Sequence, residues 1–310
     1  MKEDKKITSS ETVYHVPVLL NEVIDGLAIR PSGVYVDCTF GGGGHSRAIL
    51  EKLDSAGKLV AFDQDADAKR NLPEDERIIF VPQNFRHLHR FLRLHGISEV
   101  DGLLADLGVS SHQFDEASRG FSTRFDAALD MRMDQRQDKT AADVVKTYSE
   151  AELHKLFEQW GEVTNSRTLA KTIVEKRGVM PLNSIDDFKT ALSGVVKGNP
   201  AKYFAQVFQA LRIEVNDEMG ALKELLMQLP QVLKVEGRAA IITFHSIEDR
   251  LVKQFFKNNT FEEEEEHPFQ TTEKLRLLKP VNKKPIEASQ EELKRNPRSR
   301  SAKLRVAEKL

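Results

Sequence analysis

The sequence has little cysteine, no long apolar run and no excess of charge of either sign. Its single cysteine, Cys38, excludes an intramolecular disulfide framework and any CxxC metal or redox motif. No apolar run approaches the roughly 18 residues of a membrane-spanning helix, since the buried-looking stretch at 239–244 has only six. The first ten residues are rich in lysine and glutamate and lack the apolar segment of a signal peptide. We therefore expect a globular protein of a reducing compartment, the cytoplasm, with no membrane partner.

The composition leaves the class of partner open. Lysine and arginine number 46 against 48 aspartates and glutamates, so the formal net charge of −2 neither requires nor forbids a nucleic-acid partner. Apolar residues make up 40% of the chain, which is enough for a packed core and too much for a disordered chain. The length of 310 residues indicates about two domains.

Five short apolar runs are typical of parallel strands that are covered on both faces, because they are rich in Val, Ile, Leu and Phe rather than strictly alternating. They lie at 34–40, 58–63, 78–81, 100–104 and 238–244. Amphipathic segments lie between the earlier of these runs. This order predicts an α/β fold with a doubly wound, Rossmann-like sheet.

Between the fourth and fifth runs the pattern becomes helical. The segments 149–160, 166–177 and 184–195 carry apolar residues at a helical period, and Ser149 with Glu152 has the spacing of a capping box. We predict an inserted all-helical domain at 114–209, which divides the main domain into 1–113 and 210–310. The insert is a candidate for substrate recognition.

A glycine-rich segment, DCTFGGGGHS at 37–46, follows the first predicted strand and leads into a predicted helix. Glycines at such a turn permit positive φ and let a ligand approach the backbone closely. The full dinucleotide fingerprint is absent because Ser46 takes the place of the third glycine, and Asp-x-x-x-Gly-x-Gly instead matches the first motif of S-adenosylmethionine-dependent methyltransferases. Asp63, at the end of the second predicted strand, is suited to bind ribose hydroxyls. A tight structural turn with Asp63 as a helix cap remains the alternative.

Two further segments close predicted strands at the edge of the sheet where open α/β folds bind ligands. DLGVSSHQ at 106–113 places Asp106 there, where it can accept a hydrogen bond from an amino group; a turn that merely starts the insert is equally compatible. FHSIEDR at 244–250 places His245 there, while Ser246 and Asp249 have the spacing of a helix cap. The nine histidines lack HxH and HxxxH spacing, so we predict no metal site.

The C-terminal segment is basic. Residues 273–310 contain twelve lysines and arginines against five glutamates. Six of these cations follow one another with no acid between them: Lys294, Arg295, Arg298, Arg300, Lys303 and Arg305. We predict that they contact phosphates, with a solvated face as the alternative. The five glutamates at 262–266 are most simply a solvated loop.

Eight motifs together resemble one family. They are HVPVLLNE at 15–22, DCTFGGGGHS at 37–46, DLGVSS at 106–111, RGFS at 119–122, LDMRMD at 129–134, FQALR at 208–212, FHSIEDR at 244–250 and NPRSR at 296–300. The chain resembles the family of ribosomal RNA small subunit methyltransferase H, the 16S rRNA cytosine-N4 methyltransferases, from about His15 to Ala307. The glycine-rich motif is common to many methyltransferases, whereas DLGVSS, LDMRMD and FHSIEDR together are far more specific.

The resemblance implies transfer of a methyl group from S-adenosylmethionine to N4 of a cytosine in the decoding region of 16S rRNA, within the small ribosomal subunit. It also implies roles in cofactor binding for seven positions. These are Gly43, Gly44 and His45 at the methionine end, Asp63 at the ribose, Phe85 at the adenine, and Asp106 and Gln113 in the rest of the pocket.

For the chemistry, we expect Asp106 to accept a hydrogen bond from the N4 amino group, although a role toward the cofactor alone stays open. His245 is a second candidate, to shape the base pocket or to relay the released proton. The target base must leave its stack, and Phe121, Phe125 and Phe244 are candidates to stack on it or, equally, to pack in the core. No covalent nucleophile is required, so we expect Cys38 to be buried packing.

Two departures from related patterns qualify the resemblance. The segment FDAA at 125–128 replaces the usual Gly-Pro of the family, which predicts a different loop shape. The Pro-Pro-aromatic sequence that often follows the acidic residue in amino-group methyltransferases is absent after Asp106. Three other functions stay open: an amino-methyltransferase acting on DNA or another RNA, a Rossmann oxidoreductase, and a binding module without catalysis. The oligomeric state is open between monomer and homodimer.

Overall fold

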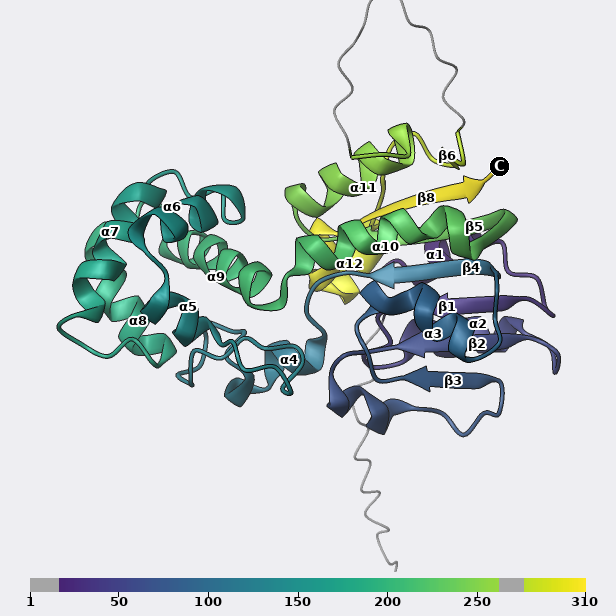
Figure 1. Ribbon diagram of the computed structural model, residues 1–310, viewed down its shortest axis with the longest axis horizontal. Coiled ribbons are helices and arrows are strands. Elements are labelled where there is room, and N and C mark those ends of the chain that lie inside the picture. The colour runs from purple at the N-terminus through teal and green to yellow at the C-terminus, as the bar shows by residue number, and fades with distance from the viewer. Residues whose placement is uncertain (1–16, 262–275) are drawn as a thin grey trace, which may run out of the picture.

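A mixed sheet with helices on both faces forms one part of the structure, and a group of helices lies beside it (Figure 1). The computed structural model describes residues 17–261 and 276–310. The glutamate run at 262–266, the first residues of the HVPVLLNE motif and the segment considered for a signal peptide lie outside the described residues. Within the described ranges, every helix is too short or too polar to cross a membrane.

The sheet has the strand order β3-β2-β1-β4-β5-β8-β6, with β7 paired to β8. The strands in the described ranges are β1 (Val34–Asp37), β2 (Lys58–Phe62), β3 (Ile78–Val81), β4 (Val100–Asp106), β5 (Leu233–Thr243), β6 (Leu278–Pro280), β7 (Ile286–Glu287) and β8 (Lys303–Lys309). The first five strands pair in parallel, and β8 is antiparallel to its neighbours. The order reverses between β1 and β4, which is where doubly wound sheets place their ligand cleft.

Alternate residues of the central strands pack on opposite faces of this sheet. Tyr35 and Leu104 belong to the core under α1 and α2, whereas Val36 and Leu103 belong to the core under α3, α10 and α11. The helices that cover the sheet or follow it are α1 (Leu20–Leu27), α2 (Gly44–Lys52), α3 (Leu88–Leu94), α10 (Glu218–Val232), α11 (Ser246–Asn258) and α12 (Gln290–Arg295). Burial on both faces explains why the strands read as continuous apolar runs in the sequence.

All five predicted strands are present, although β5 begins at Leu233 rather than at 238. The last strand, β8, was missed because its sequence reads as part of a basic tail. The structure places β8 between β5 and β6, with Leu304 and Val306 in the core. Arg305 is buried and its Nε lies 2.7 Å from Oδ1 of Asp249, so this cation is not free for phosphate. The prediction that the whole run of cations contacts phosphate is therefore wrong at Arg305.

The helices between β4 and α10 pack around a core of their own, which contains Phe157, Phe188 and Leu211. They are α4 (Ser111–Asp115), α5 (Ala141–Thr147), α6 (Glu150–Gln159), α7 (Ser166–Arg177), α8 (Ile185–Leu192) and α9 (Pro200–Asn216). The predicted capping box is confirmed, since the Ser149 hydroxyl accepts from the Glu152 amide and the Glu152 carboxylate accepts from the Ser149 amide.

The predicted limit of the insert between 209 and 210 falls inside α9. Residues on both sides of that limit, Phe208 and Leu211, contribute to the same core as the other insert helices. A domain limit inside one continuous helix would cut through this packing. We therefore propose that the helical unit extends to the end of α9 and that the chain returns to the sheet with α10.

Candidate functional site

A cleft of about 790 Å³ opens at the carboxyl ends of β1, β2 and β4. Its walls come from the glycine-rich turn, from the loop after β2 and from the turn between β4 and α4. Six of the seven residues that the resemblance implies for cofactor binding line it: Gly44, His45, Asp63, Phe85, Asp106 and Gln113. The seventh, Gly43, lies in the backbone between two lining residues. The strand order thus brings together lining residues that are up to 69 positions apart in the sequence.

The glycine-rich turn depends on the absence of side chains at two positions. Gly43 has φ +73°, and a Cβ there would lie 2.8 Å from the Phe40 ring. A Cβ on Gly44 would lie 2.3 Å from Pro17. A Cβ on Gly42 would meet no atom within 4 Å, because this part of the turn borders the open cleft. The turn therefore leaves room for a ligand against its backbone.

Asp37 anchors this turn from below. It is buried, its Oδ2 accepts from the Ser46 hydroxyl at 2.7 Å, and its Oδ1 accepts from the Thr39 amide at 3.0 Å. Burial raises the pKa of Asp37, and the nearby His45 partly opposes that shift. These contacts explain why the DCTFGGGGHS motif begins with an aspartate. They also explain why Ser46 occupies the position at which the dinucleotide fingerprint has glycine.

Asp63 joins the loop after β2 to the glycine-rich turn. Its Oδ2 accepts from the Gly41 amide at 2.7 Å, and its Oδ1 accepts from the Asp65 amide at 2.8 Å. Burial raises the pKa of Asp63 to about 7, against the lowering effect of these two hydrogen bonds. The carboxylate also lines the cleft, where each oxygen retains a lone pair for a hydroxyl donor. The alternatives of structural anchor and ribose ligand are therefore compatible with each other.

Asp106 presents an unpartnered oxygen at the end of β4. Its Oδ1 is buried and has no hydrogen-bond partner among the described residues. Its Oδ2 lies 3.7 Å from Nδ1 of His45, whose Nε2 is 2.9 Å from the carbonyl of Val18. Burial raises the pKa of Asp106 to about 6, and this shift is opposed by His45 and increased by Asp37 and Glu248. A buried acceptor without a donor is costly, which marks this oxygen as a position for a ligand N–H.

Gln113 and Phe85 complete the cleft in different ways. The Gln113 amide donates from Nε2 to Oδ2 of Asp65 at 2.8 Å, and its Oε1 accepts from the Ser110 amide in the capping box of α4. Both ends of this side chain are thus occupied by the protein. Phe85 is partly buried, packs against the core under α3 and presents an apolar surface to the cleft.

His245 has a place that the sequence did not indicate. It is itself the N-cap of α11: its Nδ1 accepts from the Glu248 amide at 3.4 Å, and its Nε2 lies 3.2 Å from Oε1 of Glu248. The prediction of a cap made by Ser246 and Asp249 is wrong, because the helix begins one residue earlier than a Ser246 cap would place it and Asp249 pairs with Arg305. His245 is not among the residues that line the cleft.

Glu248 lines the cleft instead, and the sequence analysis did not single it out. Its side chain is buried, and its Oε2 accepts from the Phe244 amide at 2.8 Å. Burial alone would raise the pKa of Glu248, but His245 and Arg212 beside it hold the pKa below its usual range. The signal available in the sequence was the spacing of three residues between His245 and Glu248, which is that of a capping box.

Of the three aromatic candidates for stacking, only Phe244 lines the cleft, next to Gly108. Phe121 is buried in the core of the insert. Phe125 is 44% exposed, with the guanidinium of Arg124 5.6 Å from its ring centre. Cys38 is a buried free thiol whose pKa burial raises. Among the described residues, no group of three or more His, Cys, Asp or Glu is placed to hold a metal ion.

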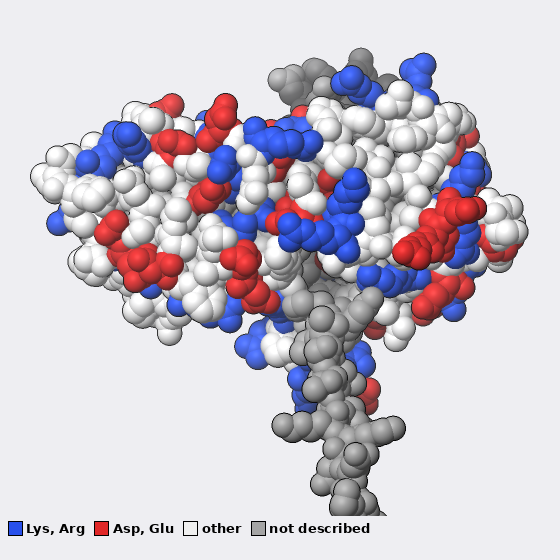
Figure 2. All heavy atoms as spheres, turned by 90° about the horizontal axis from the view of Figure 1, so that it is seen from below, with Lys and Arg blue, Asp and Glu red and all other residues white. Residues whose placement is uncertain are grey.

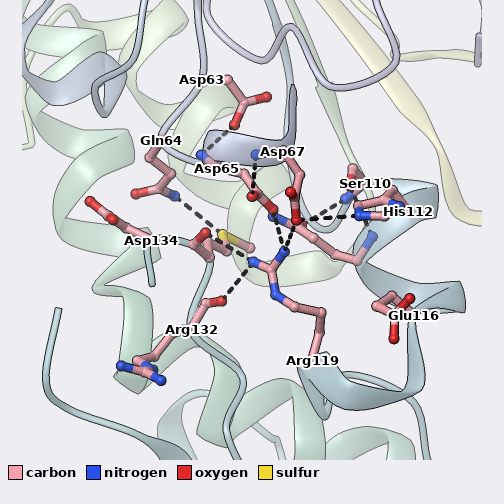
Figure 3. Close-up of polar contacts among 12 residues, drawn as sticks. Asp63, Gln64, Asp65, Asp67, Ser110, His112, Glu116, Arg119, Arg132 and Asp134 are labelled. Carbon is pink, nitrogen blue, oxygen red and sulfur yellow. Dashed lines mark hydrogen bonds and ion pairs between the residues drawn. The ribbon is translucent and has the colours of Figure 1, made fainter. Parts of the chain in front are cut away.

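Arg119 is a buried arginine that sequence reasoning missed, and it contacts the loop after β2 (Figure 3). Nη1 of Arg119 lies 2.8 Å from Oδ2 of Asp65 and 3.3 Å from Oδ2 of Asp67. Its Nη2 donates to the carbonyls of Arg132 and Met133, each at 3.1 Å. The RGFS and LDMRMD motifs therefore meet at this side chain, behind the loop that follows β2.

The NPRSR motif reaches the mouth of the cleft. Arg298 lines it and donates from Nη2 to both carboxylate oxygens of Asp115, at 2.8 and 2.7 Å, while Arg124 donates to the same carboxylate at 3.2 Å. Both guanidinium groups lie over the ring of Phe114. Lys294, Arg295 and Arg300 are exposed. Figure 2 shows basic and acidic side chains interspersed on one face of the molecule rather than a broad basic band.

Known proteins match the chain along nearly its whole length. The model of the MraW methylase family matches residues 12–310. The chain is 53% identical to "Ribosomal RNA small subunit methyltransferase H" of Phocaeicola vulgatus, over 98% of this chain and 100% of that protein. It is 54% identical to the protein of the same name from Parabacteroides distasonis, over 97% and 99%. A solved rRNA methylase from Streptococcus thermophilus aligns with 12% identity and a TM-score of 0.41, over 96% of this chain and 99% of that chain.

Proposed function

The chain belongs to the MraW methylase family, and from that premise we propose that it transfers a methyl group from S-adenosylmethionine to the N4 amino group of a cytosine in the decoding region of 16S rRNA. The names of its relatives support small-subunit ribosomal RNA as the substrate. The resemblance of its motifs to the cytosine-N4 enzymes supports the base and the atom. Action on the small ribosomal subunit would place the protein in the cytoplasm.

The observation that carries the proposal is the buried, unpartnered Oδ1 of Asp106 inside the cleft. An exocyclic amino group is a hydrogen-bond donor, and a carboxylate is an acceptor. Of the residues that line the cleft, Asp106 combines a free buried oxygen with a position at the end of β4, next to the glycine-rich turn. An acceptor at this place suits a substrate that brings an N–H group.

The residues present fit S-adenosylmethionine. The open backbone at Gly42 and the start of α2 have room for the amino-acid end, and the Asp63 carboxylate can accept from ribose hydroxyls. Phe85 offers an apolar face for the adenine. Gln113 contributes indirectly, because it holds the Asp65 carboxylate in place. When bound, this cofactor supplies an electrophilic methyl carbon on a positively charged sulfur.

The chain's contribution to the chemistry is placement and proton handling. The N4 lone pair of cytosine is delocalised into the ring, so N4 must be held in line with the methyl carbon. A hydrogen bond from N4 to Oδ1 of Asp106 increases the electron density on nitrogen. An amino group that accepts a methyl group must lose one proton, and the Asp106 carboxyl, with a pKa of about 6, can take that proton and pass it to water.

Phe244 and Glu248 form the part of the site that would bind the cytosine ring. The Phe244 ring lines the cleft and gives an extruded cytosine a face to stack on. Glu248 holds the backbone amide of Phe244 and is itself held by His245. We therefore assign His245 a positioning role through Glu248 rather than a direct proton relay. The exposed cations Lys294, Arg295 and Arg300 would contact phosphates near the mouth.

The test is methyl transfer from labelled S-adenosylmethionine to small ribosomal subunits, naked 16S rRNA and DNA in parallel, with the product mapped by nuclease digestion and mass spectrometry. We expect N4-methylcytidine at a single decoding-region position. Transfer to subunits alone would mean that the assembled shape is recognised. A methylated base other than cytosine, or transfer only to DNA, would contradict the proposal.

A further inference from the structure

Arg119 connects two loops that belong to different parts of the fold. Its side chain is only 4% exposed, so solvent does not screen its contacts. One guanidinium nitrogen faces the carboxylates of Asp65 and Asp67, and the other donates to the carbonyls of Arg132 and Met133 (Figure 3). A single side chain thus fixes the loop at 63–67 to the loop at 129–134.

On the sheet side, the contacts of Arg119 lead to the cofactor pocket. Asp65, which Arg119 binds, donates its backbone amide to Asp63, and Asp63 in turn holds the amide of Gly41. Gln113 donates to the same oxygen of Asp65 that faces Arg119. Without a cation here, the carboxylates of this loop would repel one another at close range. Arg119 therefore stabilises the arrangement that keeps Asp63 directed toward the glycine-rich turn.

On the insert side, Arg119 supports the LDMRMD loop. Its own carbonyl accepts from the Met131 amide at 3.1 Å, and Asn216 at the end of α9 accepts from the Met133 amide at 2.7 Å. Met133 lines the cleft, and its sulfur accepts from Gln64 at 3.3 Å. The loop at 129–134 is thus a wall of the cleft whose position depends on Arg119 and on α9.

We propose that Arg119 is a positioning residue that holds the loops 63–67 and 129–134 in one fixed arrangement, so that cofactor binding at the first loop also orders the second. The inference rests on the proposed function in taking S-adenosylmethionine as the cofactor. The planar guanidinium supplies the two contacts to carboxylates and the two to carbonyls at the same time, whereas the compact ammonium of lysine can satisfy only one side.

The first test is the binding of S-adenosylhomocysteine to the full chain by calorimetry. Arg119→Lys keeps the charge and loses the fork, so we expect the Kd to rise about tenfold, within the usual range of coupling between sites. Arg177→Lys is the matched control, because Arg177 donates to the carbonyls of Val145 and Tyr148 inside the insert, away from the cleft. We expect it to lower the melting temperature with less than about a twofold change in Kd.

The second test is amide hydrogen exchange with and without S-adenosylhomocysteine. In the parent protein we expect the ligand to slow exchange in residues 129–134 as well as in 63–67. In Arg119→Lys the protection of 129–134 should be lost while that of the glycine-rich turn remains. A role in stability alone would change exchange in both states equally.

The outcomes separate the inference from the proposed function. A parent protein that does not bind S-adenosylhomocysteine would overturn the proposed function. A parent that binds it, with Arg119→Lys showing the same Kd and the same protection at 129–134, would overturn the inference alone. If Arg119→Lys fails to fold, Asp67→Asn removes one of the four contacts, and it should weaken the protection of 129–134 in the same direction; unchanged protection would contradict the inference.

Discussion

Asp106 keeps a carboxylate where burial disfavours its charge. Its pKa is raised from 3.8 to about 6, so the folded state binds this proton more tightly than the unfolded state does. For an acid with a raised pKa, the free energy of unfolding falls as the pH rises from about 4 to about 6 and stays low above that. The ionised Asp106 carboxylate thus lowers the free energy of unfolding at neutral pH, and it provides an unpartnered acceptor in the cleft.

Replacing Asp106 with Asn should therefore separate stability from activity. At pH 8 we expect the free energy of unfolding to rise by about 1–3 kcal/mol, because the penalty for the buried charge disappears, whereas at pH 4 the two proteins should be alike. Methyl transfer should fall by about 10²- to 10⁴-fold, with S-adenosylhomocysteine still bound. Thermal melts at both pH values and single-turnover transfer measure this; unchanged transfer would remove Asp106 from its assigned role.

The acidity of Asp106 also sets the pH profile of the unsubstituted protein. The acceptor must be ionised, so the transfer rate should fall about tenfold per pH unit below pH 6 and level off above it. The rate constant at saturating cofactor is the quantity to follow from pH 5 to pH 8. A flat profile over that range would mean that ionisation of this carboxyl does not limit transfer.

Two neighbouring glycines give a matched pair of substitutions. Gly43→Ala places a side chain at φ +73° and 2.8 Å from Phe40, and we expect a loss of about 1–3 kcal/mol in stability. Gly42→Ala meets no atom within 4 Å and should leave the stability within about 0.5 kcal/mol of the parent. Denaturant unfolding in the absence of ligand compares them, and equal losses would show that the strain in the turn is not specific to Gly43.

At the level of elements, α11 shows how far sequence reasoning reaches. The residues of the turn after β5 are identified from the sequence, but a cap at Ser246 would start the helix one residue later than the structure does. Serine and aspartate are common caps, whereas a histidine cap is rare enough to be overlooked. Only the structure shows that the His245 imidazole accepts from the Glu248 amide and that the Glu248 carboxylate accepts from the His245 amide, both at the N-terminus of α11.

His245→Ala should consequently cost about 1–3 kcal/mol of stability, through the lost cap and the loss of the imidazole beside Oε1 of the buried Glu248 carboxylate. Ser246→Ala is the control, because the Ser246 side chain is exposed and donates to Glu162 on the surface. We expect it to change stability by less than about 0.5 kcal/mol. The reverse order of the two effects, measured by denaturant unfolding, would restore Ser246 as the cap.

The strands differ in how well the sequence identified them, for a physical reason. Strands β1 to β5 are buried on both faces and are therefore apolar along their length. Strand β8 contains Lys303 and Arg305, and these charges hid it from a search for apolar runs. Both cations pair with the carboxylate of Asp249 on α11, and Asp249 lies 54 positions away from Lys303 in the sequence. Pairing over such a distance leaves no local signal.

For the whole molecule, the C-terminal segment combines a structural and a surface role. Removing residues 303–310 should prevent the sheet from forming, since β8 pairs with β5, β6 and β7.

Replacing the exposed Lys294, Arg295 and Arg300 with Ala should instead leave the melting temperature unchanged and raise the KM for subunits, with a smaller salt dependence. Circular dichroism and transfer kinetics distinguish the two; a folded, active truncated protein would contradict the first expectation.

The position of β8 also has a consequence for synthesis of the chain. The helical unit around Phe157 and Phe188 has all its residues once α9 has been made, whereas β5 lacks its second neighbour until β8 has been made. During that interval the edge of β5, with Ala240 and Ile242, has no strand beside it. A nascent chain with an open apolar edge is prone to pair wrongly. The sheet is therefore complete only after β8 has been made, although the strands β1, β2 and β4 that carry the cleft are made much earlier.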